Sequence, residues 1–141
     1  MSDRLDHLIS YFKTITEATV PQLRDFYVAD AYFKDPFNEV HKVEQIEQIF
    51  AHMFGPLSDP RFIVHDRIEQ GDEAFLTWDF RFRIKKYKPE VEQVIRGGSH
   101  LRFDAQNNGC YHRDSWDAAE ELYEKLPLIG GLMRFMKRRM A

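Results

Sequence analysis

Apolar residues recur every three or four positions at the start of the chain, a spacing that predicts an amphipathic helix. Ser2 can cap this helix at its amino end. Its buried face is expected to carry the apolar residues Leu5, Leu8, Ile9, Phe12 and Ile15. A short second helix is expected after Thr19, which can form a capping box with Gln22, and Pro21 suits its first turn.

This short helix would bury Leu23, Phe26 and Tyr27. A third helix is predicted between residues 43 and 54, where helical spacing returns. It should end near Gly55-Pro56, since glycine and proline commonly stop helices.

From residue 61 onward the apolar positions alternate with polar ones, which predicts β-strands instead of helices. Phe62 and Val64 mark a first strand, and Gly71-Asp72 suits a two-residue hairpin turn into a second. Two more strands are predicted over about 91–103 and 110–116, joined by the loop 104–109. Helices followed by a long antiparallel meander indicate an α+β domain.

The last segment, residues 118–140, is predicted to be helical, with breaks at Pro127 and Gly130-Gly131. It combines an apolar stripe with four basic residues near its end. Such a segment can lie on a membrane or pack on its own protein, and the two glycines favour packing because they weaken an autonomous helix. We therefore expect a domain over 1–117 with a docked helical extension of the same domain over 118–141.

The composition limits the kind of protein this can be. A chain of 141 residues with 43% hydrophobic residues can bury one conventional core. The net charge of −3 argues against a nucleic-acid partner. The lone Cys110 excludes an internal disulfide, and the first residues lack the profile of a signal peptide. With no apolar run near 18 residues, a cytoplasmic protein without membrane partners is expected.

The stretch YFKDPFNEV, residues 32–40, places the carboxylate of Asp35 against a proline among aromatic residues. One interpretation is a turn, because Asp is a common turn residue and Pro presets the backbone. The other is a general base at the mouth of an apolar pocket, with its pKa raised by burial.

The order of elements and the segment from Tyr11 to Asn38 resemble the nuclear transport factor 2-like superfamily, and bacterial ketosteroid isomerases most of all. The resemblance implies a cone-shaped, curved antiparallel sheet whose N-terminal helices enclose a pocket. It aligns Tyr11 with an oxyanion-binding tyrosine, Tyr27 with a supporting tyrosine and Asp35 with the general base. Those enzymes combine an Asp base with a Tyr and a protonated Asp as hydrogen-bond donors. The resemblance also implies a homodimer formed through the convex face of the sheet.

The chain departs from that pattern at two positions. Ser99 stands where the protonated acid is expected, and Phe50 replaces a third tyrosine. The resemblance therefore implies cofactor-free acid–base isomerisation, cyclisation or dehydration of a small hydrophobic molecule, of the kind found in SnoaL-like proteins. The alternative is a non-catalytic module that binds an apolar ligand or a protein partner.

The last predicted strand carries His112, Asp114 and Trp116 on one face, because side chains alternate along a strand. A turn centred near residues 106–107 would pair Ser99 with Asp114 and Leu101 with His112. These residues could replace the missing acid and line the pocket, or His112 and Asp114 could simply satisfy each other. The other histidines show no metal-ligand spacing, so neither a metal nor a cofactor is expected.

Overall fold

The computed structural model describes residues 3–117 and 120–121. These residues form the helix α1 (Asp3–Lys13), the 3-10 helix η1 (Glu17–Asp25) and the helix α2 (Val43–Met53). The strands are β1 (Tyr27–Lys34), β2 (Glu39–Val40), β3 (Leu57–Gln70), β4 (Glu73–Ile84), β5 (Gln93–Phe103) and β6 (Gly109–Ser115). The predicted α+β class is confirmed. The expected cap Ser2 and most of the predicted C-terminal helix lie outside the described residues.

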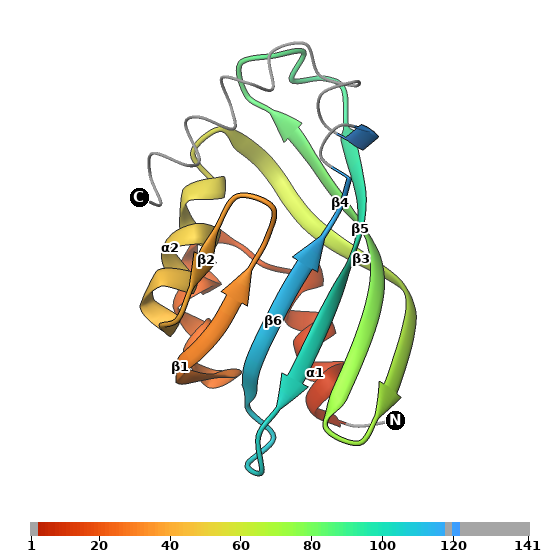
Figure 1. The fold of residues 1–141 in the computed structure, drawn as a ribbon. Coiled ribbons are helices and arrows are strands. Elements are labelled where there is room, and N and C mark those ends of the chain that lie inside the picture. The colour runs from red at the N-terminus through yellow and green to blue at the C-terminus, as the bar shows by residue number, and fades with distance from the viewer. Residues whose placement is uncertain (1–2, 118–119, 122–141) are drawn as a thin grey trace.

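One curved six-stranded sheet organises the molecule, in the order β2-β1-β6-β5-β4-β3 (Figure 1). Neighbouring strands are antiparallel except β1 and β6, which run parallel. The predicted hairpin between β3 and β4 is confirmed, and Gly71 in its turn has φ 58°, a conformation that glycine adopts without strain. The pairing of Ser99 with Asp114 and of Leu101 with His112 is also as predicted.

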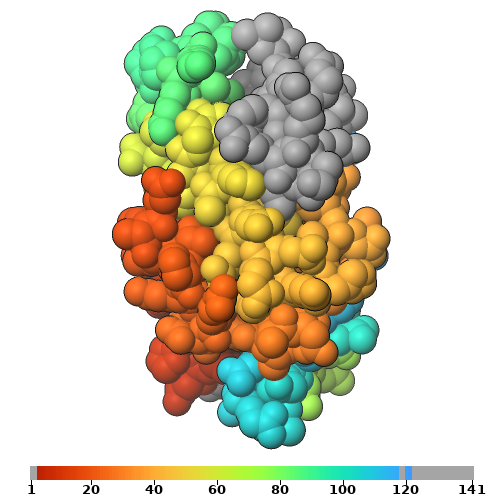
Figure 2. All heavy atoms as spheres, turned by 90° about the vertical axis from the view of Figure 1, so that its left-hand side faces the viewer, coloured from red at the N-terminus to blue at the C-terminus, as the bar shows by residue number. Residues whose placement is uncertain are grey.

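The helices cover the concave face of the sheet. Leu8 and Phe12 of α1 and Phe50 of α2 are buried and face residues of β4, β5 and β6 across the interior. Figure 2 shows this side of the molecule, with α2 in gold lying across its middle. Because both helices are amphipathic, each can bury an apolar stripe against the sheet and keep its polar side in water.

Two predictions about the chain between α1 and α2 are wrong. The capping box uses Thr16 and Thr19 instead of Thr19 and Gln22, so the helical segment begins earlier and is a 3-10 helix. The chain after Phe26 then forms the strand β1, where Tyr27 was expected to close the short helix. The partner of β1 is the remote strand β6, and no local hairpin pattern announces that pairing.

No helix among residues 3–117 and 120–121 is both long and apolar enough to span a membrane.

Candidate functional site

Two small cavities lie between the sheet and the helices. The first, which we call the His112 cavity, has a volume of about 20 Å³. It is lined by Leu8, Ile9, Phe12, Phe50, Phe62, Val64, Leu76, Trp78, Ser99, Leu101, His112 and Asp114. The second, the Asp35 cavity, has a volume of about 60 Å³. It is lined by Phe33, Asp35, Ile49, Phe50, Met53, Leu57, Phe62, Trp78, Phe80, Ile95, Asp114 and Trp116.

The two cavities adjoin, since Phe50, Phe62, Trp78 and Asp114 line both. A space of about 20 Å³ holds roughly one water molecule, and one of about 60 Å³ holds roughly four or five groups of that size. Side chains therefore fill most of the space between the sheet and the helices, and many of those that line the two cavities are aromatic.

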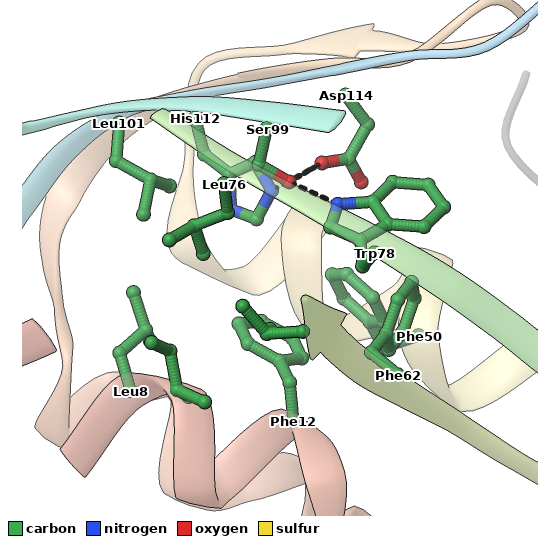
Figure 3. Close-up of a pocket in the computed structure, with 12 residues that line it drawn as sticks. Leu8, Phe12, Phe50, Phe62, Leu76, Trp78, Ser99, Leu101, His112 and Asp114 are labelled. Atoms are coloured by element: carbon green, nitrogen blue, oxygen red, sulfur yellow. Dashed lines mark hydrogen bonds and ion pairs between the residues drawn. The ribbon is translucent and has the colours of Figure 1, made fainter. Parts of the chain in front are cut away.

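Five side chains form a buried hydrogen-bonded chain beside these cavities. Figure 3 shows those of Trp78, Ser99, His112 and Asp114. The Tyr27 hydroxyl lies 2.7 Å from His112 Nδ1, and His112 Nε2 lies 2.6 Å from Asp114 Oδ1. From the other side, Trp78 Nε1 donates to Ser99 Oγ at 2.8 Å, and Ser99 Oγ donates to Asp114 Oδ1 at 2.5 Å. Strands β1, β4, β5 and β6 each contribute to this chain, so the sheet itself fixes its geometry.

One distribution of protons satisfies every bond in the chain. An ionised Asp114 accepts from both Ser99 and His112, so the imidazole carries its proton on Nε2. His112 Nδ1 then accepts from Tyr27, which acts as a donor because burial raises the pKa of its hydroxyl well above the usual range. The negative charge of Asp114 raises that pKa further.

The second carboxylate oxygen of Asp114 is available to a ligand. Asp114 is 7% exposed, and its hydrogen bonds from the side chains of Ser99 and His112 both reach Oδ1. Among the described residues, none donates a hydrogen bond to Oδ2. Because Asp114 lines both cavities, it can offer this oxygen to a molecule bound in either of them.

Asp35 forms a turn, as one interpretation of the sequence predicted, and its side chain also lines a cavity. Its Oδ1 accepts from the backbone N–H groups of Phe37 at 2.8 Å and Asn38 at 2.7 Å, which makes it a turn residue between β1 and β2. It also lines the Asp35 cavity. Burial raises the pKa of its carboxyl, the bonds from Phe37 and Asn38 lower it in part, and the charge of Asp114 raises it.

Tyr11 lies apart from Asp35, although the resemblance places the two on opposite sides of one pocket. Its hydroxyl donates to the carbonyl oxygen of Thr19 at 2.9 Å, and its ring contacts Phe12 and Phe26. It lines neither the His112 cavity nor the Asp35 cavity. Because its hydroxyl holds η1 against α1, the geometry gives Tyr11 a structural role and no route to a ligand in these cavities.

Two glycines leave room for the ends of the hydrogen-bonded chain. A methyl group on Gly97 would lie 2.5 Å from the Trp78 ring, and one on Gly109 would lie 2.8 Å from the Tyr27 ring. These positions need glycine because real Cβ atoms essentially never come so near to other atoms.

The structure thus brings together Asp114, His112, Ser99, Tyr27 and Leu101 around the His112 cavity. Asp35 and Trp116 line the adjoining cavity, and Phe50 borders both. Sequence reasoning missed Trp78, which donates to Ser99, and Asn38, which binds Asp35. The pairing of β4 with β5 sets Trp78 opposite Gly97, and a small residue opposite a large ring was the available clue.

The model of one protein family, the SnoaL-like domain, matches residues 8–109, which is more than half of the chain. The chain belongs to the SnoaL-like family. The match includes Asp35, Ser99 and Trp78, while His112 and Asp114 lie just beyond it. No curated protein matches the sequence.

Solved structures of the same fold resemble this SnoaL-like protein at low sequence identity. One is a protein of Catenulispora acidiphila with a ketosteroid isomerase-like fold, in complex with trimethylamine. It has a TM-score of 0.72 and 13% identity, covering 87% of this chain and 92% of its own. A putative SnoaL-like polyketide cyclase of Shewanella putrefaciens has a TM-score of 0.73 and 18% identity, covering 91% and 98%. An LEH-like epoxide hydrolase of Mycobacterium tuberculosis has a TM-score of 0.69 and 10% identity, covering 95% and 91%.

Proposed function

We propose that this SnoaL-like protein binds a small, mainly apolar molecule inside the cone and moves a proton on it without a cofactor. The reaction would be an isomerisation, a cyclisation or a dehydration. One observation carries the proposal: the buried carboxylate of Asp114 stands in the middle of a chain of hydrogen bonds and keeps one oxygen unbonded where the two apolar cavities meet.

The roles follow from the geometry. Asp114 Oδ2 is the base that removes a proton from a carbon of the bound molecule. Ser99 and His112 hold its other oxygen, which fixes the carboxylate in one orientation. Asp35 keeps its own proton to a higher pH than an exposed Asp, because burial raises the pKa of its carboxyl, and it returns a proton to the product.

The size of the cavities restricts the substrate to a compact molecule. Phe62 lines both cavities and is only half-buried, so a rotation of its ring would join them into one larger site. The trimethylamine held by the Catenulispora protein is a ligand of a comparable, compact kind. A steroid-sized substrate would require a larger rearrangement of the aromatic rings.

A second function, binding without catalysis, is favoured by one specific observation. Phe12, Phe50, Phe62 and Trp78 border the small cavities, and the described part of the chain leaves no ligand-sized cavity of about 300 Å³ or more open around Asp35 and Asp114. A protein of this kind would bind its ligand with the same residues and release it unchanged.

Hydrogen–deuterium exchange at carbon separates the two functions without knowledge of the natural substrate. Small enolisable ketones and a β-hydroxy ketone would be incubated with the protein in D₂O and followed by proton NMR. Catalysis predicts deuterium uptake or dehydration above the rate in buffer alone. Asp114→Asn should reduce the rate by about 100-fold or more, since a positioned base contributes about that much.

Two further variants complete this experiment. Asp35→Asn should also lose turnover while the protein still folds. Asp30→Asn is the matched control, because Asp30 is an exposed carboxylate on β1, away from the cavities. Binding of these compounds with no chemical change in any of them would support the binding module. Equal rates for Asp114→Asn and wild type would remove Asp114 from the mechanism.

A further inference from the structure

The Asp35 cavity joins negative charge to aromatic walls in a way that the proposed proton transfer does not require. Two carboxylates, of Asp35 and Asp114, line it. Six rings line it as well, those of Phe33, Phe50, Phe62, Trp78, Phe80 and Trp116. Among the described residues that line it, none is Lys, Arg or His.

We propose that the Asp35 cavity binds a compact organic cation, an alkylammonium group carried by the ligand. The proposal rests on the proposed function in one respect, that this cavity is the ligand site, and it names the chemical class of the ligand. The group would lie between the Asp114 carboxylate and the surrounding rings.

Charge is the first argument. The cavity wall carries the Asp114 carboxylate, whose described partners, Ser99 and His112, both bind it through Oδ1. Burying a charge without an opposite charge is costly, and Asp114 is only 7% exposed. The Asp114 side chain is more than nine-tenths buried, and a cation in this cavity would bind its unbonded Oδ2.

The aromatic walls are the second argument. Cations are attracted to the faces of aromatic rings within about 6 Å, and tryptophan is the strongest partner. Trp116 makes edge contacts with Phe37 at 5.8 Å and with Trp78 at 6.3 Å, while Phe62 and Phe80 stack at 4.6 Å. The rings that line the cavity therefore lie in several different planes.

The same walls argue against a metal ion. Calcium and magnesium need six or more oxygen ligands, and the wall offers two carboxylates, one of which is engaged by Asn38. No group of three or more potential metal-binding side chains exists among the described residues. An alkylammonium group needs no such shell. A cavity of about 60 Å³ also suits its size, since that space holds roughly four or five heavy atoms.

The test compares choline with 3,3-dimethylbutan-1-ol, which has the same shape with carbon in place of the charged nitrogen. Binding of both would be measured by titration calorimetry on the full chain. Choline should bind at least about tenfold more tightly than the neutral alcohol. Asp114→Asn should remove most of that ratio, and Trp116→Leu should reduce choline binding more than alcohol binding. Asp30→Asn, an exposed carboxylate, should leave both affinities unchanged.

The outcomes separate this inference from the proposed function. Equal binding of choline and the alcohol would overturn the cation site and leave an apolar ligand pocket in place. Choline binding that neither Asp114→Asn nor Trp116→Leu weakens would also overturn it, because the cation would then bind elsewhere. Absence of binding by both compounds would overturn the cation site and, with it, the choice of this cavity as the ligand site. Circular dichroism of each variant checks that the fold is intact, and Trp116→Leu provides the test if Asp114→Asn does not fold.

Discussion

Substitution of Gly97 by alanine should damage the buried hydrogen-bonded chain without touching any of its members. The new methyl group would lie 2.5 and 2.8 Å from two atoms of the Trp78 ring and 2.8 Å from the backbone oxygen of Ser115. The backbone oxygen belongs to the neighbouring strand β6, so the indole ring has to move instead. Its displacement would break the 2.8 Å bond from Trp78 Nε1 to Ser99 Oγ.

The expected loss can be worked out from these contacts. Overpacking a core position costs about 1–3 kcal/mol, and losing one net hydrogen bond costs about 1 kcal/mol. We therefore expect the free energy of unfolding to fall by roughly 2–4 kcal/mol, which lowers the melting temperature by roughly 5–15 °C in a chain of this size. Gly55→Ala is the control, because its methyl group would meet one backbone oxygen at 3.3 Å.

Urea unfolding gives the free energy, and NMR reports on Trp78 directly. The sequence contains two tryptophans, so a nitrogen–proton spectrum shows two indole signals. The Trp78 signal should shift and exchange faster with solvent in Gly97→Ala. Trp78→Phe removes the ring atoms that clash. In a protein that carries Trp78→Phe, Gly97→Ala should therefore lower the free energy of unfolding by about 1 kcal/mol less than it does in the wild type. An unchanged indole signal with a stability loss below about 0.5 kcal/mol would refute the reasoning.

Two other predictions concern pH and assembly. Burial raises the pKa of Asp35 in the folded protein, so its favourable contribution is present below the unfolded pKa of about 3.9 and is lost as the pH rises through the folded value. Urea titrations should therefore show that the free energy of unfolding of Asp35→Asn, minus that of wild type, increases from pH 4 to pH 7. If the two free energies change in parallel with pH, this prediction is contradicted. Light scattering should return a mass of twice 16.8 kDa for a homodimer formed through the convex face. Phe75 lies on β4 and is 45% exposed, and the variant Phe75→Glu should shift the mass to 16.8 kDa. A monomeric wild type would exclude this assembly.

Local patterns predicted most of the helices and the antiparallel half of the sheet. Alternation fixed the faces of β5 and β6, and the turn between them set the register that pairs Ser99 with Asp114. The strand β1 was missed because it contains two alanines and an aspartate, which favour strands weakly, and because its partner is distant in the chain.

The position of Tyr11 could not be obtained from spacing alone. A helix can present the same residue to a ligand or to a neighbouring helix, and the choice depends on how the helix is rotated on the sheet. In this protein η1 lies close enough for its carbonyl oxygens to accept the hydroxyl proton. For Asp35, the turn could be predicted because its hydrogen bonds join neighbouring residues. The cavity that Asp35 lines could not be predicted in this way, because residues from distant parts of the chain form it.

The parallel pairing of β1 with β6 determines when the site can exist during folding. Tyr32 pairs with Tyr111 and Phe33 with His112, so about two thirds of the described chain separates the partners. Contacts between such distant residues form slowly, because a long loop must close before they can. Until β6 inserts, β1 has only the two-residue strand β2 beside it, and its other edge is open to pairing with another chain. Tyr27 cannot meet His112 until the ribosome has released residue 115. A chaperone that shields the open edge of β1 until then would protect the nascent protein from aggregation.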